Sequence, residues 1–253
     1  MSGGHPHGLF VHGHDPIHRL SPHCKIVAAF LFIVVVVSTP SDLYPAFGVY
    51  ACIVVLLAGV GGLSPRGLLR RLVIEVPFLL FACFLPFLGE GPKVDVAGIA
   101  LSREGLAAAW NIVSKATLGT ATVVVLASTT QISELLRGLD RLRVPRIVTG
   151  IAGFMVRYSD VITGEMRRMK IARASRGYDP RWWWQARALA SSAGTLFIRS
   201  FERGERVHMA MVSRGFSGSL PARQQHPVAV GEWLVALALP ALAATVLLGT
   251  RLL

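Results

Sequence analysis

The stretch PHCKIVAAFLFIVVVVST, residues 22–39, decides the fold, because after Lys25 it contains no charged side chain. Ser21 as N-cap and Pro22 as the first helical residue are typical of a helix start. About 20 apolar residues of helix cross a bilayer core of about 30 Å. We expect Lys25 to extend back to the headgroups, which makes this short segment long enough. The segment is therefore predicted to span a membrane.

Four further apolar stretches follow, at 44–62, 72–88, 105–128 and 229–249. The mean hydropathy of +0.54 and the low charged fraction of 16% are typical of a membrane protein. Pro77, Pro86 and Pro240 are expected to kink their helices, and no removable signal peptide is expected at the start. The predicted fold class is an all-α membrane protein with about five transmembrane helices plus a cytoplasmic region of long amphipathic helices between the fourth and fifth spans.

Basic residues are concentrated between the fourth and fifth spans. Residues 129–226 carry 17 Lys and Arg against seven Asp and Glu, in a chain with a net charge of +12. Loop 63–71 has three arginines and no acid, whereas loops 40–43 and 89–104 are net acidic. Because cytoplasmic loops are enriched in Lys and Arg, 129–226 and the N-terminus are predicted to be cytoplasmic. The distribution of positive charge thus indicates the orientation of the chain in the membrane. The apolar spans exclude a soluble nucleic-acid-binding domain.

These features divide the chain into a histidine-rich cytoplasmic segment 1–21, transmembrane helices in 22–128, cytoplasmic helices in 129–226 and a final transmembrane helix in 227–253. Six of the eight histidines lie in the first 23 residues, and His-x-His pairs can bind cobalt or nickel. A cytoplasmic position is the wrong side for capturing an incoming ion, so we favour a solvated tail. Cys24, Cys52 and Cys83 lack zinc-like spacing and are expected to be small buried hydrophobic residues.

Three amphipathic helices are predicted within the basic region. The first has Ile132 and several leucines on one face and stops before Pro145. The second starts near Val144, and its apolar stripe consists of Ile151, Met155, Ile162, Met166 and Met169. The third starts at Asp179–Pro180 and continues through Phe197, Phe201 and Met209. The second and third end at Gly177 and Gly215, which are typical C-cap residues.

The same short motif stands at both of these helix ends: ARASRGYD at 172–179 and AMVSRGFS at 210–217. One copy would be ordinary helix termination, in which an arginine complements the helix dipole. Two matched copies favour a pair of docking tips whose arginines form bidentate bonds with carboxylates of a partner. The predicted site residues are Ser175, Arg176, Gly177, Ser213, Arg214 and Gly215, supported by Ala172, Tyr178, Ala210 and Phe216.

The doubled Ser-Arg-Gly motif resembles the signature of the transmembrane T component of energy-coupling-factor (ECF) importers, which are ABC-type importers of micronutrients. DPIHRLSPHCK (15–25) is similar to the family motif before the first span, and ELLRGLDRLRVP (134–145) to the lead into its coupling helices. Longer stretches such as AWNIVSKATLGT (109–120) resemble the cobalt and nickel branch, the CbiQ type. The family commonly has Ala-Arg-Gly where this chain has Ser-Arg-Gly, a change that we expect to preserve docking.

The resemblance implies a division of labour in the cell membrane. Two ECF ATPase subunits (CbiO type) would bind and hydrolyse ATP. A metal-binding membrane subunit (CbiM type), with or without a small accessory membrane subunit (CbiN type), would capture the ion. This chain would couple them by seating Arg176 and Arg214 in the ATPases, as a non-catalytic permease subunit without a cofactor or metal of its own. No lysine follows a glycine, so the sequence has no Gly-Lys-Ser/Thr phosphate loop.

Three polar residues, Glu75, Asn111 and Lys115, are predicted to lie within or near the membrane, where ionisable groups are functional candidates. Glu75 and Lys115 fall at different depths, about 5 and 20 Å from the inner ends of their helices, so a direct ion pair is not expected. Contacts with other subunits or with a solvated cavity are favoured instead. The run Trp182 to Trp184 is expected to be an interfacial anchor rather than a stacking site.

Several alternatives stay open. The chain could be the T component of a vitamin importer, and cobalt is not distinguished from nickel. A stand-alone secondary transporter or channel is disfavoured by the small number of intramembrane polar groups. A membrane-bound binder of nucleic acid or anionic lipid, driven by the basic region, is disfavoured by the interspersed acids and the capped helix ends.

Overall fold

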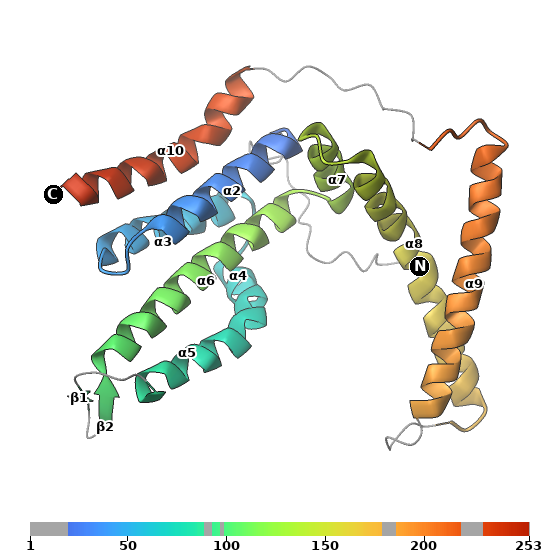
Figure 1. The fold of residues 1–253 in the computed structure, drawn as a ribbon, viewed down its shortest axis with the longest axis horizontal. Coiled ribbons are helices and arrows are strands. Elements are labelled where there is room, and N and C mark those ends of the chain that lie inside the picture. Colours follow the sequence, from blue (N-terminus) through green and yellow to red (C-terminus); the bar gives the residue numbers. More distant parts are fainter. Residues whose placement is uncertain (1–19, 89–92, 97–98, 179–185, 219–229, 253) are drawn as a thin grey trace. The chain divides into compact units, whose positions relative to one another are not determined.

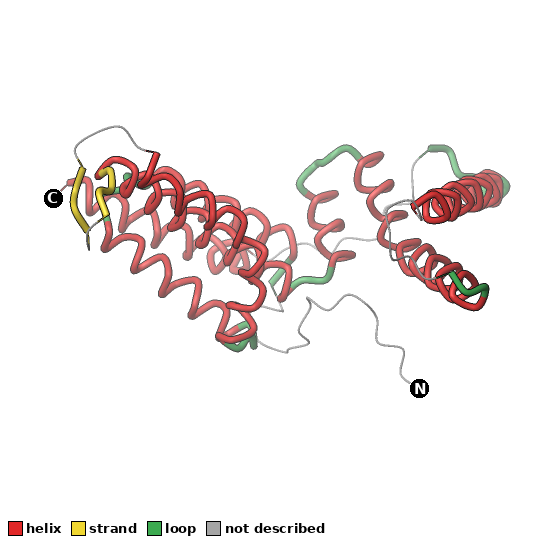
Figure 2. Tube along the Cα trace, turned by 90° about the horizontal axis from the view of Figure 1, so that it is seen from below, coloured by secondary structure: helices red, strands yellow, loops and turns green. Residues whose placement is uncertain are grey.

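A computed structural model of the 253-residue chain describes residues 20–88, 93–96, 99–178, 186–218 and 230–252. The described part is almost entirely helical, with one pair of short strands (Figure 2). It forms two compact units, which we call the bundle unit (residues 1–138 and 227–253) and the paired-helix unit (residues 139–226). The predicted all-α fold class is confirmed.

The bundle unit contains the apolar helices. They are α2 (Pro22–Ser38), α3 (Tyr44–Val60), α4 (Pro65–Leu72), the 3-10 turn η1 (Val73–Glu75), α5 (Val76–Leu88), α6 (Arg103–Thr129), most of α7 (Ile132–Arg141) and α10 (Val230–Leu252) (Figure 1). Within the described residues, Pro65–Leu88, Arg103–Thr129 and Val230–Gly249 are long and apolar enough to cross a membrane, and α2 and α3 are shorter apolar helices. All five predicted spans are therefore helical.

Two segments predicted as loops have regular structure. Ser64 Oγ accepts a hydrogen bond from Gly67 N at 3.1 Å and Pro65 is the first helical residue, so the basic residues of loop 63–71 lie on helix α4. The loop at 89–104 contains strands β1 (Lys93–Val96) and β2 (Ile99–Ser102), paired antiparallel. Pro77 is the second residue of α5, which follows the turn η1, and Pro86 and Pro240 lie inside α5 and α10.

Helices α2 and α6 run antiparallel, and each supplies a lysine that caps the other. Lys25 Nζ donates to Thr129 O at 3.1 Å and to Thr130 Oγ1 at 3.3 Å, at the end of α6. Lys115 Nζ donates to Val37 O at 2.8 Å, near the end of α2. The last carbonyls of a helix lack intrahelical partners and carry partial negative charge, so an ammonium stabilises them. Lys25 is only 7% exposed, because its ammonium group lies against the end of α6; its depth relative to the headgroups stays a prediction.

One end of the bundle unit gathers the start of α2, the end of α6 and the start of α10. Ser21 N donates to Glu232 Oε2 at 3.0 Å, which joins α2 to α10. Arg71 Nη1 donates to Ser128 Oγ, which joins α4 to α6. We call this the connector end, because the chain leaves it through α7 and α10 begins there. Helices α2 and α10 consequently run parallel, and α6 runs opposite to both.

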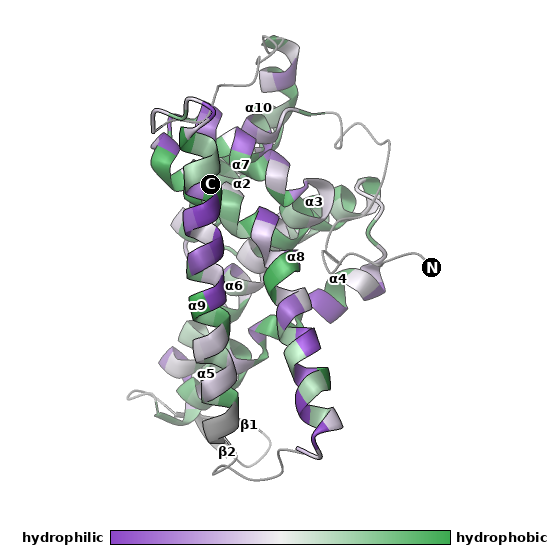
Figure 3. Cartoon of the chain, turned by 90° about the vertical axis from the view of Figure 1, so that its right-hand side faces the viewer, coloured by the Kyte–Doolittle hydropathy of each residue, from purple (hydrophilic) through white to green (hydrophobic). Residues whose placement is uncertain are grey.

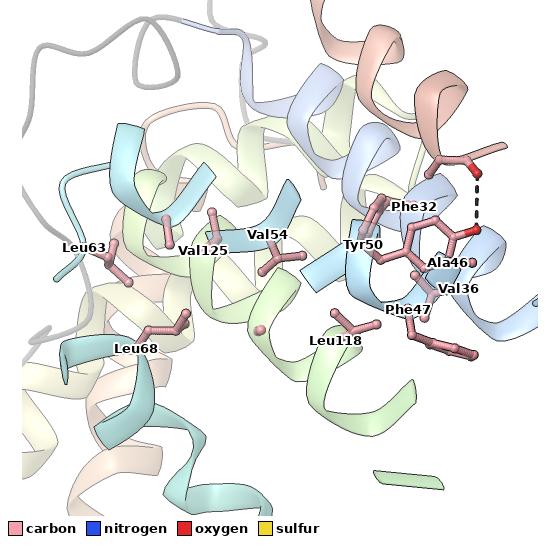
Figure 4. Packing of buried hydrophobic residues seen from close by; sticks show 13 residues of the cluster. Phe32, Val36, Ala46, Phe47, Tyr50, Val54, Leu63, Leu68, Leu118 and Val125 are labelled. Atoms are coloured by element: carbon pink, nitrogen blue, oxygen red, sulfur yellow. Dashed lines mark hydrogen bonds between the residues drawn. The ribbon is translucent and has the colours of Figure 1, made fainter. Parts of the chain in front are cut away.

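The core of the bundle unit is built around α3. Tyr50 is fully buried, with its ring edge-on to Phe32 at 5.9 Å and its hydroxyl donating to Ala243 O at 3.3 Å (Figure 4). This bond gives the phenolic group an acceptor, without which its burial would be costly. The remaining core residues are Val36, Ala46, Phe47, Val54, Ala58, Leu63, Leu68, Leu118, Ala121 and Val125. Four helices besides α3 thus share one core.

The outward surface of the bundle unit is apolar. Phe78, Phe81 and Phe84 on α5 are each more than 60% exposed, as expected for side chains that contact lipid. Cys52 and Cys83 belong to this surface, and only Cys24 is buried. The prediction of buried cysteines is therefore right for Cys24 and wrong for the other two, because both lie on outward helix faces.

The paired-helix unit consists of α8 (Arg146–Ser175) and α9 (Ala186–Val212), with hydrophilic and hydrophobic residues alternating along α8 (Figure 3). The predicted apolar stripe of α8 is present, but no residue of α8 is buried, and Met155 is 69% exposed. On α9, Phe197 and Phe201 are 71% and 60% exposed. The predicted start of the third helix at Asp179–Pro180 lies outside the described residues. Residues 139–178 and 186–218 thus form no continuous core like that of the bundle unit.

Candidate functional site

The first Ser-Arg-Gly motif closes α8 with a defined turn. Gly177 has φ +72°, in the left-handed region that favours glycine. Gly177 N donates to Ala174 O at 3.0 Å, and Tyr178 N donates to Arg173 O at 3.1 Å. These two bonds define a Schellman motif, which satisfies carbonyls at the end of the helix. The turn places Arg176 at the C-cap position, directly after the last helical residue Ser175.

The second motif closes α9 with the same geometry. Gly215 has φ +85°, its N donates to Val212 O at 2.9 Å, and Phe216 N donates to Met211 O at 3.0 Å. Each donor and acceptor lies 38 residues after its counterpart in the first motif. The sequence repeat is therefore also a structural repeat of the backbone, with Arg214 in the position of Arg176.

The side chains of the two motifs are also matched. Ser175 Oγ donates to Ile171 O at 3.0 Å and Ser213 Oγ donates to Ala210 O at 3.1 Å, so both hydroxyls bond to their own helix. Arg176 and Arg214 are exposed, and neither guanidinium forms a hydrogen bond or an ion pair with another described residue. The supporting residues are Ala172 and Ala210, which are exposed, and Tyr178 and Phe216, which are partly buried. Each motif thus presents an arginine outward from a fixed turn.

A third helix end has the same turn without a glycine. At the end of α7, Arg143 N donates to Asp140 O at 3.2 Å and Val144 N donates to Leu139 O at 3.2 Å. Arg143 takes the left-handed position with φ 64°, which costs energy for a residue with a Cβ. The sequence predicts that this helix stops before Pro145, as it does, but gives no sign of the left-handed turn because no glycine stands at position 143. Arg143 is the strained member of the three turns.

An ion-pair cluster joins α8 to α9. Glu165 accepts from Arg168 Nη2 on its own helix and from Arg199 Nη1 on α9, each at 2.6 Å. Hydrogen bonds from Arg168 and then Arg199 hold the pKa of the Glu165 carboxyl below its ordinary value. Arg176 and Arg214 lie 11 residues beyond Glu165 and 15 beyond Arg199. Because the helices run antiparallel, the two arginines are about 40 Å apart along the pair.

An apolar recess lies between α8 and α9 on the side of the second motif. Phe154, Tyr158, Val207 and Met211 contribute to its lining, and its volume is about 320 Å³. The rings of Phe154 and Tyr158 stack with their centroids 6.4 Å apart. The two helices therefore meet closely at Glu165 and leave unfilled space toward the end of α9. Such a pair is held by few contacts.

The three intramembrane polar candidates do not form one site. Glu75 is buried and accepts from Thr117 Oγ1 at 3.1 Å, whereas Lys115 caps α2. Their different partners agree with the expectation that Glu75 and Lys115 form no direct ion pair. Asn111 Oδ1 is buried without a hydrogen-bond partner in the described part of the chain. Of these three residues, only Asn111 is thus left with an unpaired polar atom that a neighbouring molecule could satisfy.

A metal site is not visible in the described residues. They contain no group of three or more His, Cys, Asp or Glu side chains that could hold a metal ion. The N-terminal histidines at positions 5, 7, 12, 14 and 18 and the tryptophans at 182–184 lie outside the described residues. His23 is buried and packs edge-on against Trp233 at 5.4 Å, which makes it part of the bundle unit.

The chain is similar in sequence to known proteins. The family model CbiQ, described as cobalt transport protein, matches residues 13–227. The chain is 29% identical over 158 residues to cobalt transport protein CbiQ of Rhodobacter capsulatus, covering 62% of this chain and 63% of the relative. It is 26% identical over 223 residues to the energy-coupling factor transporter transmembrane protein EcfT of Bacillus selenitireducens, covering 83% of each.

A further relative is longer than this chain. The putative fused cobalt transport protein CbiMQ of Methanocorpusculum labreanum is 26% identical over 226 residues, which cover 84% of this chain and 37% of the relative. The chain thus spans little more than a third of that protein, but most of the EcfT relative. The match of the family model over most of the chain shows that this multi-pass membrane protein belongs to the CbiQ family of cobalt transport proteins, the transmembrane components of energy-coupling-factor transporters.

Proposed function

We propose that this chain is the coupling subunit of a cobalt importer. In this proposal two partner ATPases bind and hydrolyse ATP, a separate membrane subunit binds the metal, and the chain transmits motion between them. The observation that carries the proposal is the structural repeat at Arg176 and Arg214. Two identical turns present two exposed guanidinium groups, as two copies of one ATPase would require.

The chemistry of each tip suits a carboxylate socket. The guanidinium forms two parallel hydrogen bonds with a carboxylate, and these charge-assisted bonds are stronger than neutral ones. The Schellman turn fixes the backbone of Arg176 and Arg214, so little conformational freedom is lost on docking. Ala172 and Ala210 leave room for close approach of the partner.

The ion pairs at Glu165 make the helix pair suitable for transmitting movement. The pair with Arg199 joins α8 to α9 between the two tips, so that displacement of one tip is transferred to the other helix. Few other contacts hold the helices, which leaves their mutual angle adjustable. This design differs from that of an enzyme active site, because the motif residues include neither a nucleophile paired with a base nor a metal-ligand set.

The proposed topology places the N-terminus and the connector end in the cytoplasm. Arg66, Arg70 and Arg71 on α4 belong to this end, through the bond from Arg71 to Ser128. An excess of arginine marks the cytoplasmic side of membrane proteins. The chain runs from this end into α7 and the 17 basic residues of 129–226, so both basic segments would lie on one side.

Cobalt is the proposed cargo because the matching family model and one relative are described as cobalt transport proteins. The EcfT relatives support a second candidate, in which the chain serves an importer of another micronutrient such as a vitamin. Uptake of radioactive cobalt or nickel by cells that express the chain with its genomic neighbours distinguishes the two. Cobalt uptake above that of empty cells supports the proposal, and uptake of a vitamin without either metal contradicts it.

The coupling role is tested by removing both guanidinium groups. The Arg176→Ala, Arg214→Ala double variant is expected to lower ATPase stimulation and co-purification of the ATPases by more than about 100-fold, because each of the two charge-assisted pairs contributes about 1.5–3 kcal/mol. The matched control is the Arg157→Ala, Arg206→Ala double variant, which removes one exposed arginine from each of the same helices away from the tips. Equal losses in both variants, or none in the first, contradict the proposal.

A further inference from the structure

An apolar groove lies at the connector end of the bundle unit. It has a volume of about 450 Å³, and its lining includes Ala28, Ala29, Leu57, Leu126, Val235 and Leu242, from helices α2, α3, α6 and α10. The two alanines provide little side chain to fill the space. Between Val235 and Leu242 of α10 the groove extends about 10 Å along the helix axis, roughly a third of the hydrocarbon core.

Lys25 supplies the charge in the lining of this groove. An ammonium has three N–H donors, and the structure shows two of them bonded to the neutral acceptors Thr129 O and Thr130 Oγ1. The acid that acts electrostatically on Lys25, Glu134, is itself paired with Arg137 at 3.4 Å. The groove therefore combines an apolar wall with a cation that has capacity for one more acceptor.

We propose that this groove binds an anionic phospholipid of the membrane, with the phosphate beside Lys25 and one acyl chain along α10. Basic pockets between transmembrane helices bind anionic headgroups in this way. Arg71, bonded to Ser128, brings a second cation to the same end of α6. A partner helix in the groove would supply apolar side chains and leave the third donor of Lys25 without an acceptor, which is costly away from water. The charge of Lys25 thus favours a lipid phosphate.

Lipid retention by the complete chain in complex with its partner subunits tests the proposal by native mass spectrometry in detergent. The probes are phosphatidylglycerol and phosphatidylcholine with the same oleoyl chains. We expect the wild type to retain phosphatidylglycerol at least about fivefold better, because the headgroup charge adds attraction on the order of 1 kcal/mol. Lys25→Met should abolish this preference. Lys115→Met, which removes the other capping lysine outside the groove, should preserve it.

A second variant fills the groove and keeps the lysine. Ala28→Leu should lower retention of both lipids by about tenfold, whereas Ala51→Leu on the outward face of α3 should leave it unchanged. If Lys25→Met does not fold, Ala28→Leu decides the question. Equal retention of the two lipids by the wild type, a preference that survives Lys25→Met, or retention unaffected by Ala28→Leu would each overturn the proposal. Cross-linking of Ala28→Cys to the partner membrane subunit would show instead that a protein fills the groove.

Discussion

The bundle unit and the paired-helix unit are built from similar helices but bury them differently. In the bundle unit Phe32 and Tyr50 are fully buried, and Lys25 has acceptors at the end of α6. In the paired-helix unit no residue of α8 is buried, and Phe197 on α9 is 71% exposed. The first unit completes its core within the chain and presents an apolar surface to lipid. The second is a pair of helices held together by few contacts, which suits an element that a partner covers and moves.

The space around the glycines shows the same difference in packing between the two units. A Cβ on Gly105 would come within 2.4 Å of Leu85 O, and one on Gly138 would come within 3.0 Å of His23 N. Glycine is therefore required where α6 meets α5 and where α7 meets α2. At Gly153 on α8, by contrast, a Cβ would have no neighbour within 4 Å.

The largest expected effect on stability comes from exchanging these glycines for alanine. Gly105→Ala should lower the free energy of unfolding by about 1–3 kcal/mol, because backbone atoms must move apart. Gly153→Ala should raise it by about 0.5–1 kcal/mol, because alanine loses less entropy in a helix and meets nothing. Thermal and denaturant unfolding followed by circular dichroism measures both. Destabilisation of similar size at the two positions would show that the units are packed alike.

The three Schellman turns allow a comparison with opposite signs. Gly177→Ala should destabilise the end of α8 by about 1–2 kcal/mol, because alanine is strained at φ +72°. Arg143→Gly should stabilise the end of α7 by about 1 kcal/mol, because it removes the strain at φ 64°. Amide hydrogen exchange at Tyr178 N and Val144 N, which close the two turns, should become about tenfold faster in the first variant and slower in the second. Changes of the same sign would contradict this account of the turns.

The smallest expected effect concerns the ion pairs at Glu165. Its pKa is lowered in the folded chain, so the pairs stabilise above the ordinary pKa of a glutamate, about 4.3, and are lost as the pH falls through the lower folded value. Spin labels on α8 and α9 should show a broader distance distribution once the pH falls below the lowered pKa of Glu165 than at pH 7. Glu165→Gln should be broad at both pH values, and Glu202→Gln on α9 serves as control. A wild-type distribution that does not change with pH would exclude a role of these pairs in joining the helices.

The sequence predicts most of the helices because hydrophobic length, proline and glycine determine them locally. The five spans and the ends of α8 and α9 at Gly177 and Gly215 follow from such local signals. The hydrogen-bond partners of Lys25 do not follow from local signals, because Thr129 and Thr130 are about a hundred residues away in the sequence. The sequence predicts a loop at 63–71 because its three arginines outweigh the N-cap signal of Ser64, whereas the structure forms helix α4 there and buries Leu68.

The candidate site shows the same division between local and long-range information. The repeated motif identifies Arg176 and Arg214 from the sequence, and the structure adds that their turns have the same hydrogen bonds. The pairing of Glu165 with Arg199 joins residues 34 positions apart on different helices, which no local pattern indicates. The docking of Arg176 and Arg214 to ATPases stays a prediction, since it depends on a surface that belongs to another protein.

Thiol accessibility tests the central claim, that both motif tips lie in the cytoplasm and dock on ATPases, most directly. Ser175→Cys and Ser213→Cys are made one at a time in a background with Cys24, Cys52 and Cys83 replaced, and are labelled with a membrane-impermeant maleimide. The account predicts labelling in inside-out vesicles only, and protection of both positions when the ATPase subunits are bound. Labelling from the outer face, or labelling that bound ATPases leave unchanged at both positions, would contradict it.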